Sequence, residues 1–149
     1  IWYRMPTEQS VRSWIESTPP HFIFSPKANR LVTHIHRLKA DALTAAQFML
    51  DRLNLLAEAK RLGPVLLQLP PNLRRDDERL ENFLSRLATH TRWAMEFRHD
   101  SWIVPEIESL LRRHGVAWAA LETDETRAER RDTGRYTSAL RAAKPQVAT

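Results

Sequence analysis

The sequence predicts an α/β fold in which about four parallel strands alternate with helices, as in part of a TIM-type (β/α)8 barrel. Three observations predict it. Short apolar runs alternate with amphipathic stretches at intervals of roughly 20–40 residues. Polar residues follow the apolar runs where the strands should end. The third run carries charged residues on one face, which a barrel interior accommodates better than a sheet covered on both faces. A small flavodoxin-like sheet is the competing architecture.

The amino-terminal part of the chain predicts two helices and one strand. Apolar residues at helical spacing predict a helix at about 7–17, which the proline pair 19–20 ends. Alternating apolar and polar residues predict a strand at 21–27. After a polar loop, apolar residues with a 3.6-residue period predict a long helix at about 41–61, and Gly63 is expected to be its C-cap.

Three further strands and two further helices are expected after Gly63. The apolar runs at 64–69, 93–97 and 116–121 predict the strands. One helix should begin at the acidic pair 76–77, whose charges suit the positive end of the helix dipole. The other has Pro105 in its first turn, and a glycine ten residues later is expected to end it.

Length and composition describe one ordinary domain of 149 residues. No apolar run approaches the ~18–20 residues that span a bilayer, so no membrane partner is expected. The absence of cysteine excludes disulfides and thiolate sites and makes a cytoplasmic location the default. The net charge of +5 comes mainly from the end of the chain, because residues 1–126 hold 17 cations against 16 anions. We expect residues 1–126 to form a partial barrel domain and 127–149 to be a polar, Arg-rich tail, disordered or non-native.

Four polar residues mark the carboxyl ends of the predicted strands, where parallel α/β folds bind their ligands. They are Lys27, Gln68, Glu96 and Arg98. We expect all four to converge at one mouth of the sheet. The structural alternatives are a buried Glu96–Arg98 ion pair that only fills the barrel, a Lys27 side chain that reaches solvent at the rim, and a Gln68 amide satisfied within the core.

Two histidines and a tryptophan are further candidates. His99 lies just past a strand end beside a cation, which favours a role in a site. His34 lies in a loop, where solvent exposure and chemistry are equally compatible with its position. Trp102 either packs the loop after the third strand or stacks on a ligand. No metal ligands are predicted, because no His-x-x-x-His or paired-acid spacing falls on one helix face. No glycine-rich phosphate loop follows a strand, and the sequence identifies no cofactor.

Four phrases of the sequence resemble the YecE-like proteins, also called domain-of-unknown-function family 72, in order and spacing. They are WYRMP, FSPKANRLVTH, LGPVLLQLPPNL and FRHDSW, and the resemblance covers roughly residues 2–124. It implies a (β/α)8 barrel, usually in a cytoplasmic bacterial or archaeal protein, whose biochemical activity has no settled assignment. The matching residues that would line the cleft are Tyr3, Arg4, Lys27, Thr33, His34, Gln68, Pro70, Glu96, Arg98, His99, Trp102 and, less closely, Asp124.

The sequence departs from this family in three places. Asp100 stands where the family usually has proline. The family begins with a strand and helix that do not precede Ile1, and it continues past Asp124 into strands that 127–149 does not resemble. We therefore expect a fragment, truncated at the front and truncated or frameshifted at the back.

The leading hypothesis is an enzyme that acts on a small polar or anionic substrate at the carboxyl-terminal mouth of a barrel. Lys27, Arg98 and His99 would supply positive charge or hydrogen-bond donors, and Glu96 would be a base or an orienting group. The substrate-binding residues would be Tyr3, Arg4, His34, Gln68, Trp102 and Asp124. The alternatives are a barrel that processes or binds nucleic acid, for which the nearly neutral residues 1–126 give little support, and a non-catalytic ligand-binding barrel.

Overall fold

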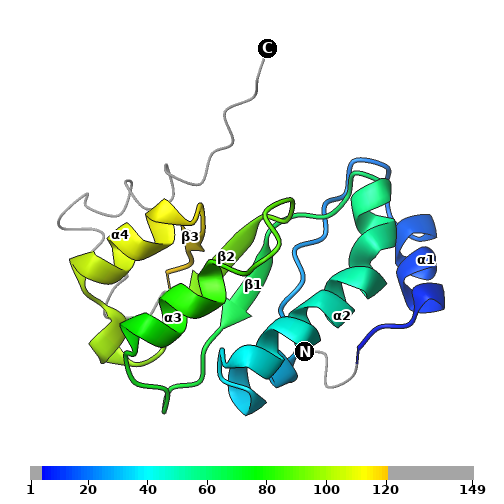
Figure 1. Ribbon diagram of the computed structural model, residues 1–149. Coiled ribbons are helices and arrows are strands. Elements are labelled where there is room, and N and C mark those ends of the chain that lie inside the picture. Colours follow the sequence, from blue (N-terminus) through cyan, green and yellow to red (C-terminus); the bar gives the residue numbers. More distant parts are fainter. Residues whose placement is uncertain (1–4, 121–149) are drawn as a thin grey trace.

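The computed structural model describes residues 5–120, which form a parallel sheet with helices packed against it (Figure 1). The sheet has three strands in the order β1-β2-β3. They are β1 (Val65–Gln68), β2 (Trp93–Glu96) and β3 (Ala117–Trp118). Each adjacent pair is parallel, and the strands are joined by helical connections, so the predicted α/β fold with a parallel sheet is confirmed.

Residues 5–120 also form four α-helices and two shorter helical turns. They are α1 (Glu8–Glu16), a π-helical turn (Leu31–Ile35), α2 (Ala40–Glu58), α3 (Asp77–Leu84), a 3₁₀ turn (Asp100–Trp102) and α4 (Pro105–Arg113). The four predicted helices are confirmed, and each later helix begins as the sequence indicates. The Asp76 side chain accepts the Arg79 N–H as the N-cap of α3, and Pro105 occupies the first turn of α4.

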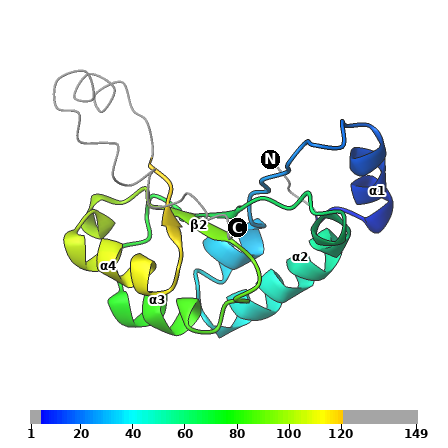
Figure 2. The same ribbon diagram turned by 90° about the horizontal axis from the view of Figure 1, so that it is seen from above.

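The two faces of the sheet have different environments. Helices α2, α3 and α4 lie on the same side of it (Figure 2). On that side the alternate strand residues are buried, and they are Val65, Leu67, Leu69, Trp93, Met95 and Phe97. The opposite face carries the partly exposed Leu66 and Ala94, followed along the same strands by Gln68 and Glu96. The predicted alternation is therefore confirmed, and it leaves the polar residues on the face away from these helices.

The segment 21–27 differs from its prediction as a strand. It pairs with the chain around β1 only through two isolated parallel bridges, Phe24 with Leu62 and Lys27 with Leu66. Pro26 lies in this segment and Pro64 lies in the chain that it pairs with, and proline has no N–H to donate to a β-ladder. The backbone hydrogen bonds therefore stop and resume on either side of the prolines, and a continuous strand does not form.

The end of α2 also differs from its prediction. The helix ends at Glu58, and the residue that turns the chain is Lys60, in the left-handed region at φ 56°. Gly63 is therefore not the C-cap. A Cβ at Gly63 would lie 2.9 Å from Ile23 Cγ2 and 3.0 Å from the Phe24 carbonyl oxygen, so glycine allows segment 21–27 to approach closely. Gly115, in contrast, follows α4 with φ 65°, as expected for a residue that ends a helix.

A buried arginine joins α1 to the chain that follows α2. The Arg61 guanidinium donates to the carbonyl oxygens of Ile15, Phe22 and Pro19 at 2.7, 3.0 and 2.8 Å, and to the Thr18 hydroxyl. It also lies 5.3 Å from the centre of the Phe24 ring. Carbonyl groups near a helix end lack partners within the helix, so this cation closes the carboxyl end of α1.

Candidate functional site

Four side chains form a chain of hydrogen bonds at the carboxyl-terminal edge of the sheet. Lys27 Nζ donates to Gln68 Oε1. Gln68 Nε2 donates to Glu96 Oε1 at 2.9 Å, and Arg98 Nε donates to the same oxygen at 3.0 Å. The predicted convergence of these four residues is therefore confirmed, and their role in a site stays a prediction.

Strand register explains why these residues meet. Gln68 pairs with Glu96 across the β1–β2 ladder, and Lys27 pairs with Leu66, two residues before Gln68. Neighbouring strands lie about 4.8 Å apart, and residues in register point to the same face. Arg98 follows Glu96 by two residues and so returns to that face. The three polar residues on successive segments consequently lie within hydrogen-bond reach of one another.

The chain of side chains is buried at its centre and open at one end. The Glu96 side chain is 10% exposed, whereas that of Arg98 is 40% exposed. Arg98 uses its Nε toward Glu96, and within residues 5–120 its two terminal nitrogens make no hydrogen bond. Glu96 therefore fixes the position of a guanidinium whose outer edge is available to a ligand.

His34 lies in the same electrostatic environment. It is part of the π-helical turn that follows Lys27, and its Nδ1 lies 2.8 Å from the Thr33 hydroxyl oxygen. Burial lowers the pKa of His34, and the positive charges of Arg30, Lys27, Arg98 and Arg37 lower it further. The π-helical turn that carries His34 also contacts β1, the strand that ends at Gln68.

Arg37 connects the turn that carries His34 to the loop that follows β1. Its Nε donates to the His34 carbonyl oxygen and its Nη2 to Asn72 Oδ1, both at 3.3 Å. Sequence reasoning did not single out Arg30, Arg37 or Asn72. The available signal was the density of basic residues at 30–39, directly after a predicted strand end.

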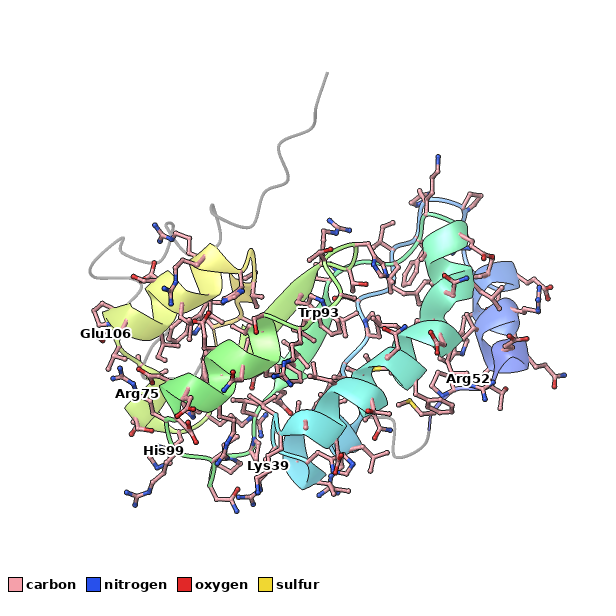
Figure 3. All side chains as sticks on the ribbon, in the orientation of Figure 1. Lys39, Arg52, Arg75, Trp93, His99 and Glu106 are labelled. Atoms are coloured by element: carbon pink, nitrogen blue, oxygen red, sulfur yellow. The ribbon has the colours of Figure 1, made fainter. Side chains whose placement is uncertain are left out.

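The structure gives His99 and Trp102 other partners. His99 Nδ1 accepts the Ser101 backbone N–H at 3.1 Å, as the N-cap of the 3₁₀ turn, and the Ser101 hydroxyl accepts the backbone N–H of Arg75 (Figure 3). Trp102 is 1% exposed, its indole N–H donates to the Leu73 carbonyl oxygen, and its ring stacks on Phe97. These contacts favour the packing alternative for Trp102.

The other predicted site residues divide into two groups. Thr33 and Pro70 are buried beside the candidate site segments. Tyr3, Arg4 and Asp124 lie outside the described residues, as does the predicted boundary at 126. Among residues 5–120, no three His, Asp or Glu side chains are grouped so as to hold a metal ion. No helix in this part of the chain is both long and apolar enough to cross a membrane.

Comparison with protein families identifies the chain. Residues 1–146 match the family described as "Protein of unknown function DUF72". The chain belongs to the DUF72 family. The match includes most of segment 127–149. None of the curated proteins matches this DUF72 chain.

Solved DUF72 structures share the fold of this chain. A DUF72 family protein from Thermotoga maritima is 28% identical, with a TM-score of 0.65 over 79% of this chain and 46% of its own. A crystal structure of a DUF72 family protein from Enterococcus faecalis matches with a TM-score of 0.64 over 78% of this chain and 46% of its own. The two sequences are 18% identical. The chain therefore spans about half the length of these structural relatives.

Proposed function

We propose that this DUF72 protein is an enzyme that binds a small anionic substrate at the carboxyl-terminal edge of its sheet. The observation that carries the proposal is the chain of hydrogen bonds that holds Lys27 and Arg98 at the end of the sheet, beside the turn that carries His34. Four cations, Lys27, Arg30, Arg37 and Arg98, act on the His34 imidazole. The carboxylate that accepts a hydrogen bond from one of them, Arg98, is that of Glu96. Such an excess of positive charge attracts an anion.

The proposal gives each side chain a distinct role. Lys27 and the outer edge of Arg98 bind the anion. Gln68 and Glu96 orient these two cations, because the Gln68 amide oxygen accepts a hydrogen bond from Lys27 and the Glu96 carboxylate accepts one from Arg98. His34 transfers a proton through Nε2, since its Nδ1 is engaged by Thr33 and a lowered pKa keeps the ring neutral near pH 7. We prefer His34 to His99 as the acid–base group because the turn that carries His34 contacts β1, and Lys27 and Arg98 act on its imidazole.

We further propose that the sheet belongs to a (β/α)8 barrel. Two observations support this architecture. Helices α2, α3 and α4 all cover one face of a parallel sheet, as the outer helices of a barrel do. The structural relatives are about twice as long as the part that this chain matches. In such a barrel the chain from Lys27 to Arg98 would lie at the carboxyl-terminal mouth, where barrel enzymes bind their substrates.

The test is a thermal-shift screen of the full chain with matched sets of phosphorylated, carboxylated and neutral small molecules. The proposal expects anionic hits that are lost in Lys27→Ala and Arg98→Ala and retained in Arg112→Gln. Arg112 is a suitable control because it is an exposed cation on α4, paired with Glu108. Hits confined to neutral compounds, or hits insensitive to Lys27 and Arg98, would contradict an anion site.

Turnover separates an enzyme from a ligand-binding barrel. Each hit is incubated with the protein, and its conversion is followed by NMR. His34→Gln should abolish conversion, because the amide cannot exchange a proton near pH 7, while Lys27 and Arg98 still bind the anion. Binding without conversion of any hit would favour the non-catalytic alternative. Retention of oligonucleotides with an affinity that falls steeply with salt would favour nucleic-acid binding.

A further inference from the structure

We propose that the anion at this site is a tetrahedral dianion, a phosphomonoester or inorganic phosphate, held between Lys27, Arg98 and His34. This inference rests on the anion site proposed above and specifies its ligand. Two features of the described residues support a dianion over a monocarboxylate: the balance of charge, and the number and type of hydrogen-bond donors that remain available.

The charge balance favours two negative charges. Arg30, Lys27, Arg98 and Arg37 all act on His34, and Glu96 neutralises one of them through Arg98. A bound carboxylate would compensate only one of the remaining cations. A dianion compensates two further cations. It therefore gains more from this site than a monoanion of similar size.

The available donors also match a phosphoryl group. Lys27 gives one of its three N–H groups to Gln68, and Arg98 gives only its Nε to Glu96. Within the described part of the chain, the remaining ammonium hydrogens, both guanidinium Nη groups and His34 Nε2 are without hydrogen-bond partners. A carboxylate offers two oxygens to these three side chains, and a phosphoryl group offers one oxygen to each.

The same arrangement predicts a response of His34 to the ligand. Burial and the charges of Arg30, Lys27, Arg98 and Arg37 lower its pKa in the free protein. A dianion bound against Nε2 opposes those charges and should raise the pKa of His34. A monoanion should raise it less. The imidazole is therefore a local reporter of the charge of the ligand.

The experiment is an NMR titration of the full chain at constant ionic strength, with sulfate, phosphate, methyl phosphate and acetate as probes. Sulfate is included because it stays a dianion over the whole pH range, so that only the protein titrates. We expect sulfate and methyl phosphate to bind at least about tenfold more tightly than acetate, with shifts centred on 27–37, 68–72 and 96–98. Sulfate should also move the His34 imidazole titration to higher pH. Arg98→Gln should weaken sulfate about tenfold or more, as expected for a charged hydrogen bond, and Arg112→Gln should not.

The outcomes separate this inference from the proposed function. Acetate binding as tightly as sulfate at these residues would overturn the dianion and leave the anion site intact. No perturbation of these residues by any of the anions would overturn both. Tighter binding of inorganic phosphate than of methyl phosphate would identify the free ion as the ligand, and the reverse order would identify an ester. Sulfate binding that leaves the His34 titration unmoved would overturn the placement of the anion against His34.

Discussion

Replacement of Glu96 separates the structural and chemical roles of the hydrogen-bonded chain. The carboxylate oxygen Oε1 accepts from both Gln68 and Arg98, and the side chain is 10% exposed. Glu96→Ala removes the acceptor for two donors at once. Glu96→Gln keeps an oxygen in the same place and removes only the charge. The two variants therefore differ in which interaction they delete.

The stability cost of Glu96→Ala follows from the burial of its two partners. Gln68 is buried, so its Nε2 would be left without an acceptor, at a cost of about 1–3 kcal/mol. The Arg98 side chain is 40% exposed, so water can solvate its freed Nε at little cost. We expect a loss of about 1–3 kcal/mol, less than the ~3–5 kcal/mol typical of a fully buried broken ion pair. Glu96→Gln should cost about 1 kcal/mol or less.

Anion binding should respond in the opposite direction. Glu96→Gln removes a negative charge near the anion, and two charges about 4 Å apart in water interact by about 1 kcal/mol. We therefore expect sulfate to bind roughly fivefold more tightly to Glu96→Gln than to the unaltered protein. If Glu96 only orients Arg98, turnover of a substrate found by the screen should also survive in this variant.

The measurements are urea unfolding, read by tryptophan fluorescence, and sulfate titration by NMR. Equal midpoints for Glu96→Ala and the unaltered protein would refute the stability argument, because they would mean that Gln68 loses nothing. Weaker sulfate binding by Glu96→Gln would refute the electrostatic argument. Loss of turnover with tighter binding would identify Glu96 as the acid–base group in place of His34.

Three further predictions concern stability, each measured by urea unfolding. Arg61→Lys should destabilise the protein by about 2–4 kcal/mol, because an ammonium cannot replace the several hydrogen bonds of the buried guanidinium, whereas the exposed Arg12→Lys should be neutral. Gly63→Ala should cost about 1–3 kcal/mol, because its Cβ would meet backbone 3.0 Å away, and Gly115→Ala, with open space and φ 65°, should cost about 1 kcal/mol. The lowered pKa of His34 means that the unfolded chain binds a proton more readily than the folded one. Stability should therefore fall as pH drops below about 6.5 and this fall should be smaller in His34→Gln; an equal fall in both would exclude His34 as its source.

Periodicity predicted most of the elements because the core of this protein is regular. The buried residues of α3 and α4 recur at helical spacing, and those of β1 and β2 alternate, so each pattern reflects one covered face. Segment 21–27 alternates in the same way and still does not form a strand. Alternation records which side chains face inward, and it does not record that Pro26 and Pro64 each lack an N–H for the ladder.

The convergence of the four polar residues could be predicted because it depends on strand ends alone. Parallel strands place their carboxyl ends at one edge, and alternation assigns Gln68 and Glu96 to one face of that edge. The contribution of the π-helical turn could not be predicted in the same way. The backbone that follows this turn holds Arg37 and Leu38 in the left-handed region, and no periodic pattern specifies such a path.

The choice between His34 and His99 shows what a position in sequence leaves open. His99 follows β2 directly, beside Arg98, so sequence reasoning placed it in the site ahead of His34. In the structure Asp100–Trp102 forms a 3₁₀ turn, and the Ser101 N–H at its start donates a hydrogen bond to His99 Nδ1. His34 lies seven positions after Lys27 on the π-helical turn, and the charges of both Lys27 and Arg98 lower its pKa. Both imidazoles use Nδ1 for a local contact, so what distinguishes His34 is the positive charge that acts on it and the contact of its turn with β1. For this reason the NMR titration of the His34 imidazole is informative: a dianion bound against Nε2 should raise its lowered pKa, and an unchanged titration would place the anion elsewhere.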